Sequence, residues 1–193
     1  MKLAILILAG GTSSRMGTPK QLLPYKNTHL LGQVIEQASA THNSEVYCVL
    51  GAFKEEIKKS IDLSKVNIIE NTHFNHGLST SIVAGIQVLQ QLTYDAVLIL
   101  LADQPLITTD DINCLRSAAI KNPHVIIASE YGKKTGVPAL FPKNYFSELL
   151  QLKGDAGARA LLNNPNTPLI KIPSNHLKDI DTPEEYQSLL NNQ

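Results

Sequence analysis

Short apolar runs alternate with segments of helical periodicity along almost the whole chain. The apolar runs predict strands at residues 3–8, 45–50, 66–70, 96–102, 124–129 and 169–172, with a short apolar piece at 137–141. The segments between them predict helices at about 29–40, 53–60, 78–92, 109–120, 143–150 and 155–162. This order predicts the α/β class: a Rossmann-like, doubly wound, mostly parallel sheet with helices on both faces and an antiparallel piece late in the chain.

A last helix begins near the end of the sequence. Thr182 is its expected N-cap, Pro183 its first residue, and Glu185 closes a capping box, which accounts for Thr182 without any function. The sequence shows no internal repeat, low-complexity segment or linker. We therefore predict a single domain over residues 1–193.

The composition narrows the classes of function. Apolar residues make up 43% of the chain and charged residues 18%, and 17 basic residues balance 17 acidic ones. Such a balance gives no net field for nucleic acid or for a membrane surface. No apolar run approaches the roughly 20 residues that a membrane-spanning helix needs, and the first run breaks at glycines rather than at a cleavage site. An anionic ligand must therefore be held by charges concentrated at one place.

The two cysteines, Cys48 and Cys114, lie far apart inside apolar segments. We expect buried, unreactive thiols rather than a disulfide framework or a thiolate metal site. This cysteine usage favours the reducing cytoplasm.

The stretch LAGGTSSRMGTPKQLLP follows the first predicted strand, where ligands bind in sheets of this class. Its glycines let backbone N–H groups approach an anion, its hydroxyl groups add donors, and its basic side chains add charge. The residues concerned are Gly10, Gly11, Thr12, Ser13, Ser14, Arg15 and Lys20. Pro19 excludes the G-x-x-x-x-G-K-[ST] phosphate loop, and no G-x-G-x-x-G is present, so the loop is expected to stay open and long. The alternative is a flexible connection without function.

Three aspartates follow predicted strands or precede the last helix. Asp103 follows the central strand, where a carboxylate can hold Mg²⁺ together with waters and substrate phosphates. Asp181 or Asp179 could complete that site, since the two lie on one side of an extended segment. The alternatives are a simple turn at Asp103 and solvated turn residues at the other two positions.

The stretch NTHFNHGLSTS, residues 71–81, leads into the predicted helix at 78–92. Ser79, Thr80 and Ser81 offer donors in its first turn that could face a base, a ribose or a phosphate, although helix capping explains Ser79 equally well. His73 and His76 lack a third ligand, so zinc is disfavoured. No nucleophile-elbow pattern and no activated cysteine is visible, which argues against covalent catalysis.

Together, these motifs resemble those of the MobA-like nucleotidyltransferases, and within them most closely the molybdenum cofactor cytidylyltransferases. The matching motifs are LAGGTSSRMGTPKQLLP, NTHFNHGLSTS, ADQP, GVPALF with GDAGARALL, and DIDTPEEY, which span nearly the whole chain. The resemblance implies transfer of a nucleoside monophosphate from an Mg²⁺-bound nucleoside triphosphate to a phosphate on molybdopterin, with release of pyrophosphate. It also implies a molybdoenzyme of the xanthine dehydrogenase type as the user of the product.

The resemblance also implies residue roles. The catalytic residues are Lys20, Arg15 and Asp103, and Asp103 and Asp181 are the metal ligands. The nucleotide-binding residues are Leu8, Ala9, Gly10, Gly11, Thr12, Ser13, Ser14, Lys20, Asn71, Gly77, Ser79 and Ser81. The acceptor-binding residues are Gly136, Pro138, Asp155 and Arg159.

One departure from the motifs of the cytidylyltransferases concerns which nucleobase is bound. The cytidylyltransferases usually read AAG where this chain reads AGG at residues 9–11, as the guanylyltransferase branch does. The later motifs favour CTP, and this position favours GTP. Other phosphorylated acceptors, such as a sugar phosphate or a methylerythritol phosphate, and a non-catalytic nucleotide-binding or cofactor-insertion protein, stay as alternatives.

Overall fold

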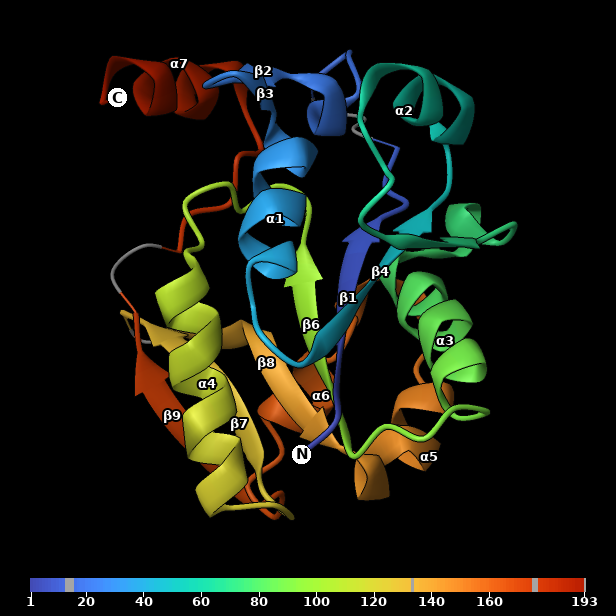
Figure 1. Cartoon of the computed structure of the whole chain (residues 1–193), viewed down its shortest axis with the longest axis vertical. Helices are drawn as coiled ribbons and strands as arrows, with labels where there is room; N and C mark the ends of the chain where they lie inside the picture. Colours follow the sequence, from blue (N-terminus) through green and yellow to red (C-terminus); the bar gives the residue numbers. More distant parts are fainter. Residues whose placement is uncertain (13–15, 133, 175–176, 193) are drawn as a thin grey trace.

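The computed structural model describes residues 1–12, 16–132, 134–174 and 177–192. Its main sheet has seven strands in the order β5-β4-β1-β6-β8-β7-β9 (Figure 1). The strands are β1 (Leu3–Ala9), β4 (Ser44–Leu50), β5 (Asn67–Glu70), β6 (Ala96–Leu101), β7 (Ile126–Tyr131), β8 (Lys134–Pro142) and β9 (Leu169–Pro173). Strand β8 runs antiparallel to β6 and β7, whereas the other neighbouring pairs are parallel. The predicted mostly parallel sheet with a late antiparallel piece is confirmed.

Strand β1 shows why its sequence is apolar at every position. Side chains alternate between the faces of a strand. Leu3, Ile5 and Ile7 pack with α1 (Leu30–Ser39) and α4 (Thr109–Lys121), while Leu6 and Leu8 pack with α3 (Leu78–Leu89) on the opposite face. Helices α1 and α4 lie in front of the sheet in Figure 1. Both faces are covered, as a continuously apolar strand requires.

The remaining helices are α2 (Lys54–Ser60), α5 (Phe146–Leu150), α6 (Arg159–Leu162) and α7 (Pro183–Asn191), with 3-10 turns η1 (Lys20–Leu22), η2 (Phe74–His76), η3 (Lys143–Tyr145) and η4 (Gly154–Ala156). Thr182 and Glu185 form the predicted capping box of α7. Within the described ranges, no helix combines the length and the apolar character needed to cross a bilayer.

A small hairpin was not predicted from the sequence. Strands β2 (Pro24–Tyr25) and β3 (Thr28–His29) form it directly after η1, and it packs against α7 at the top of Figure 1. The Tyr186 hydroxyl donates a hydrogen bond to the carbonyl oxygen of Pro24 at 2.6 Å. Two-residue strands carry too few apolar positions to show a period, so the pattern could not reveal them.

The prediction for the cysteines is half right. Cys48 is buried in β4, and burial raises the pKa of its thiol to about 12. Cys114 is exposed, so the prediction that it is buried was wrong. The buried stripe of α4 consists of Ile112, Leu115 and Ala119, and Cys114 lies off that stripe.

Candidate active site

Two neighbouring strands bring the first loop and Asp103 together. Strands β1 and β6 are paired in parallel, with Leu8 opposite Leu101, so the residues that follow them emerge at the same edge of the sheet. Gly10 and Gly11 follow β1, and Asp103 follows β6. This edge is where open α/β sheets bind their ligands.

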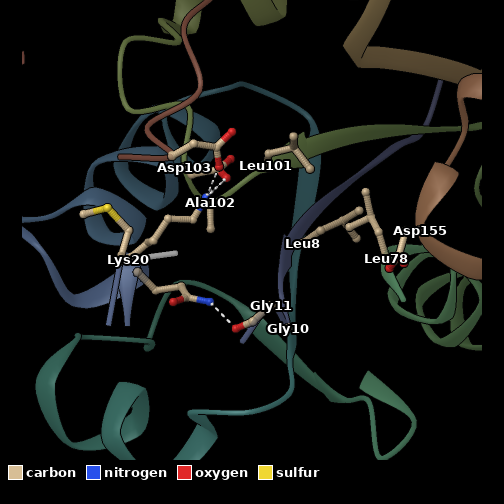
Figure 2. A pocket seen from close by; sticks show the side chains of 12 residues that line it. Leu8, Gly10, Gly11, Lys20, Leu78, Leu101, Ala102, Asp103 and Asp155 are labelled. Carbon is tan, nitrogen blue, oxygen red and sulfur yellow. Dashed lines mark hydrogen bonds and ion pairs between the residues drawn. The ribbon is translucent and has the colours of Figure 1, made fainter. Parts of the chain in front are cut away.

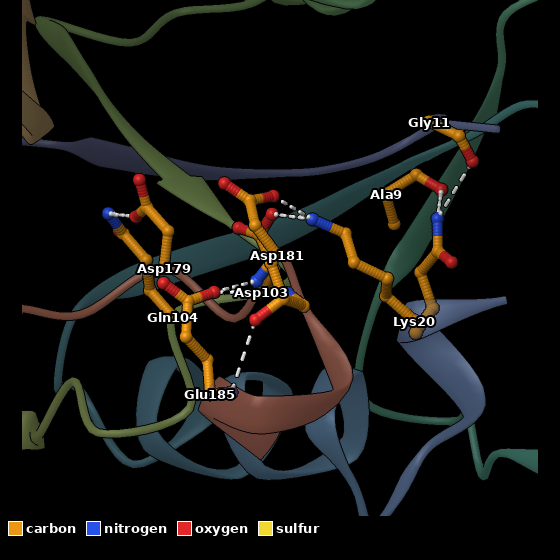
Figure 3. Close-up of polar contacts among 10 residues, drawn as sticks. Ala9, Gly11, Lys20, Asp103, Gln104, Asp179, Asp181 and Glu185 are labelled. Atoms are coloured by element: carbon orange, nitrogen blue, oxygen red, sulfur yellow. Dashed lines mark hydrogen bonds and ion pairs between the residues drawn. The ribbon is translucent and has the colours of Figure 1, made fainter. Parts of the chain in front are cut away.

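Lys20 bridges two carboxylates at this edge. Its Nζ atom lies 2.7 Å from Asp103 Oδ2 and 2.7 Å from Asp181 Oδ1 (Figure 3). Burial alone would lower the pKa of the Lys20 ammonium, but the two carboxylates outweigh it and raise the pKa above its ordinary value. Lys20 is therefore a permanent cation at neutral pH.

Asp103 lies in a low-dielectric position that does not satisfy all of its oxygens. Its Oδ1 atom is buried and has no hydrogen-bond partner among the described residues. Burial raises the pKa of this carboxyl group, Lys20 opposes that effect, and the negative charges of Asp179 and Asp181 add to it. A buried carboxylate oxygen without a donor has free capacity for a cation.

The two aspartates before α7 have different partners. Asp181 contacts Lys20, whereas Asp179 Oδ1 accepts a hydrogen bond from Gln104 Nε2 at 2.8 Å (Figure 3). The backbone N–H of Ile180, between them, donates to the carbonyl oxygen of Asp103 at 3.0 Å. This bond fixes the segment against the loop after β6, and of the two aspartates it is Asp181 that shares Lys20 with Asp103.

Gln21 holds the first loop in place, a role that its sequence did not reveal. Its side chain is buried, and Nε2 donates to the carbonyl oxygens of Ala9 at 3.0 Å and Gly11 at 3.1 Å (Figure 3). Both bonds span the glycine turn and fix its carbonyl oxygens.

We expect the Gln21→Ala variant to lose about 1–3 kcal/mol in free energy of unfolding, because the buried carbonyl of Ala9 and the partly buried carbonyl of Gly11 lose a donor. Nucleotide affinity should fall as well, since the loop is no longer fixed. Urea denaturation and nucleotide titration measure the two effects. Gln87→Ala, at an exposed position of α3, is the matched control and should change neither. A Gln21→Ala variant with unchanged stability would contradict the assigned role.

A cavity of about 530 Å³ opens over these residues (Figure 2). One end carries the Lys20–Asp103–Asp181 group, and the other carries Leu8, Leu78 and Asp155. The full lining consists of Leu8, Gly10, Gly11, Met16, Lys20, Gln21, Leu78, Leu101, Ala102, Asp103, Asp155 and Asp181. The cavity thus has a charged end and a largely apolar end.

The polar side chains of residues 71–81 form hydrogen bonds mainly within this segment. Asn71 Nδ2 donates to Thr80 Oγ1 at 2.8 Å and to Ser81 Oγ at 3.0 Å, and Asn71 Oδ1 accepts from the His73 backbone N–H at 2.9 Å. Ser79 is completely buried, and within the described part of the chain its hydroxyl has no hydrogen-bond partner. The side chain from this segment that lines the cavity is Leu78. Asn71 and Ser81 therefore fix the start of α3, and their contact with a nucleotide stays a prediction.

Close packing explains why position 10 is a glycine, whichever nucleobase the protein binds. A Cβ atom at Gly10 would lie 2.8 Å from Ser81 Oγ, and one at Gly51 would lie 2.5 Å from the Gly10 carbonyl oxygen. The backbones after β1 and β4 therefore approach each other too closely for side chains. An alanine at position 10 requires Ser81 to move, which explains the first glycine of AGG in this chain.

The predicted acceptor residues are distributed over strand β8 and two cavities. Gly136 and Pro138 are buried in β8, and Asp155 lines the first cavity. Arg159 lines a second cavity of about 660 Å³, which is rich in polar groups. Its lining consists of Tyr131, Lys134, Thr135, Arg159, Leu162, Asn163, Asn164, Pro165, Thr167, Leu169, Lys171 and Asp179. Gln104, bonded to Asp179, connects this cavity to the loop that carries Asp103.

The other predicted residues are placed as follows. Leu8 and Ala9 are buried, Thr12 is exposed, and Gly77 adopts a left-handed φ of 98° against Gly154 and Asp155. Ser13, Ser14 and Arg15 lie outside the described residues. In the parts of the chain that the structure covers, no three His, Cys, Asp or Glu side chains are grouped to hold a metal. A metal here would take protein carboxylates together with substrate and water oxygens.

A family model described as the MobA-like NTP transferase domain matches residues 5–169, and the chain belongs to this family. It is 30% identical to the purine catabolism protein PucB of Bacillus subtilis, over 94% of this chain and 92% of PucB. It is 26% identical to the bifunctional protein GlmU of Pseudomonas syringae, and this match covers 93% of the chain but 39% of GlmU.

Solved mycobacterial structures have the same fold. A homologue of Mycobacterium tuberculosis Rv0371c from Mycobacterium sp. strain JC1 superposes with a TM-score of 0.85 at 27% identity, covering 99% of this chain and 96% of that one. Rv0371c itself, solved in complex with manganese, gives a TM-score of 0.80 at 24% identity over the full length of both chains. At that identity the second similarity concerns the fold alone.

Proposed function

We propose that this protein transfers a nucleoside monophosphate, preferentially CMP, from an Mg²⁺-bound nucleoside triphosphate to the phosphate of a molybdopterin-type acceptor. An acceptor phosphate oxygen forms a bond to the α-phosphorus, the bond to the bridging oxygen breaks, and its electron pair leaves with pyrophosphate. The observation that carries the proposal is the Lys20–Asp103–Asp181 group beside the glycine loop in a cavity of about 530 Å³.

The residues fit a reaction that depends on charge neutralisation. The attacking oxygen is already anionic, so no general base is needed, and the obstacle is the approach of two anionic phosphates. Lys20 stays protonated because the carboxylates raise its pKa, which suits a cation that contacts phosphate rather than a base. The backbone N–H groups of Gly10 and Gly11 supply further donors for the triphosphate.

Asp103 and Asp181 fit a magnesium ion. Both offer hard oxygen ligands, and Asp103 Oδ1 is a buried oxygen for which the described chain supplies no donor. When bound, Mg²⁺ would neutralise triphosphate charge. The manganese in the Rv0371c structure supports a divalent cation in this fold. Lys20 would then share its carboxylates with the ion and turn its ammonium toward phosphate.

We assign the acceptor to the second cavity. Lys134, Arg159 and Lys171 give it positive charge, which Asp179 and the Glu130 partner of Lys171 offset only in part. Such a lining suits a phosphorylated acceptor. The name of PucB supports molybdopterin among such acceptors, because xanthine dehydrogenase-type molybdoenzymes oxidise purines and purine catabolism needs that step. Such a molybdoenzyme is the proposed user of the product.

The preference for CTP rests on the later motifs. The argument for GTP rests on Gly10. The close approach of Gly10 to Ser81 explains this glycine by packing, without reference to the base. GTP is therefore the second candidate.

Pyrophosphate release tests the proposal. The purified protein is incubated with Mg²⁺, each of CTP, GTP, ATP and UTP, and molybdopterin, a sugar phosphate or methylerythritol phosphate as acceptor. We expect release with CTP and molybdopterin. Release with another acceptor would replace the substrate, and nucleotide binding without release for any acceptor would identify a binding protein instead.

A further inference from the structure

The apolar end of the first cavity carries a carboxylate that the transfer reaction does not use. Asp155 lines this end together with Leu8 and Leu78, across the cavity from Lys20 and Asp103 (Figure 2). Its side chain is exposed, and the described part of the chain gives it neither a hydrogen bond nor an ion pair. A carboxylate on an otherwise apolar wall is a specific feature of a ligand site.

The position of Asp155 is fixed by its neighbours. Gly77, at the start of α3, packs against the 3-10 turn η4, and a Cβ atom at Gly77 would lie 2.5 Å from the Gly154 carbonyl carbon and 2.6 Å from Asp155 Oδ1. Gly77 and Gly154 both adopt left-handed φ values, 98° and 69°. These glycines allow η4 to approach α3 closely and bring Asp155 to the cavity wall.

Leu78 shows what kind of group this end can accept. The side chain is 39% exposed although it is large and apolar, and it lines the cavity beside the buried Leu8. A flat heterocycle placed here would cover Leu78, while its phosphates would reach the cationic end of the same cavity.

We propose that the Leu8–Leu78–Asp155 wall is the nucleobase subsite and that Asp155 selects a base with amino N–H donors. A carboxylate accepts hydrogen bonds but cannot donate them. Cytosine presents an amino group where uracil presents a carbonyl oxygen, and guanine presents an amino group that hypoxanthine lacks. Asp155 thus favours CTP over UTP, or GTP over ITP. This inference rests on the proposed function, because it names how that site chooses its nucleotide.

Nucleotide titration with Mg²⁺ and without acceptor tests the subsite. The wild-type protein should bind the amino-bearing nucleotide about 10-fold to 100-fold more tightly than its partner in the CTP/UTP or GTP/ITP pair, the size of a charge-assisted hydrogen bond. In Asp155→Asn, whose amide can also donate, this ratio should fall about 10-fold or more. Asp110→Asn, at an exposed position of α4, should leave it unchanged.

The Leu78→Ala variant distinguishes apolar contact with the ring of the base from hydrogen bonding to the edge of the base. It should weaken all four nucleotides by a similar factor and leave the ratios intact. The proposal is overturned if Asp155→Asn keeps the wild-type ratio, or if it weakens all nucleotides equally with a matching loss of stability in urea, as expected for a residue that merely supports α3. Clear base selection without pyrophosphate release would sustain the subsite and reject the transfer reaction. Pyrophosphate release without base selection would do the reverse.

Discussion

Replacement of Lys20 by alanine should lower kcat by about 100-fold to 1,000-fold, the usual effect of removing one charged or donating group that acts on a transition state. Stability should change less. The loss should not exceed about 3 kcal/mol, the lower end for a broken buried ion pair, because Asp181 is 42% exposed and Asp103 can take up a proton. Pyrophosphate release at saturating nucleotide and urea denaturation measure the two quantities.

Lys121→Ala provides the control, since Lys121 is an exposed lysine in the last turn of α4. It should retain wild-type turnover. Near-normal kcat in folded Lys20→Ala would remove Lys20 from the catalytic group. A loss of activity that merely follows loss of folded protein would show that the Lys20 bridge is structural.

The Asp103→Asn variant should lose about 100-fold or more in turnover. An amide oxygen is a poor substitute for the carboxylate that we propose as a metal ligand, and such a metal contributes several kcal/mol to the reaction. Its affinity for Mn²⁺ in the presence of nucleotide should fall as well. The Mn²⁺ titration, followed by electron paramagnetic resonance, distinguishes a lost metal ligand from a general disturbance, and Asp110→Asn should leave it unchanged. Wild-type Mn²⁺ affinity in Asp103→Asn would exclude Asp103 as a ligand.

Stability should depend on pH through the raised pKa of Asp103. Because burial raises the folded-state pKa of Asp103 above its unfolded value, this carboxyl group stabilises the fold at pH values below its unfolded pKa. That contribution is lost as the pH rises through the folded-state pKa. Asp103→Asn cannot lose it, so its free energy of unfolding relative to wild type should increase from about pH 4 upward. A stability difference that is independent of pH would contradict the raised pKa.

Most of the fold could be predicted from the sequence because each central strand is apolar over its whole length. The run 96–102 could hardly be anything but a strand covered on both faces, and β6 confirms it. The capping box at Thr182 was readable because it depends on residues three positions apart. The hairpin β2–β3 was not, since its position depends on contacts with α7 rather than on local pattern.

The site was readable in part. The glycine loop with Lys20 and the position of Asp103 stood out because both belong to segments that follow predicted strands, where sheets of this class bind ligands. Gln21 could not be found, because its role depends on carbonyls 12 and 10 residues earlier in a folded loop. Nor could the sequence separate Asp181 from Asp179, or Asp155 from Arg159, because their separation depends on which cavity each segment borders.

The bond between Lys20 and Asp181 joins positions 161 residues apart. During synthesis on the ribosome, a chain that has emerged only as far as α6 already contains the glycine loop and Asp103 but lacks one of the carboxylates that flank Lys20. The sheet can assemble strand by strand from local βα units, whereas this contact closes a very long loop and must come late. A nascent chain therefore cannot complete its charged centre before the segment preceding α7 has docked.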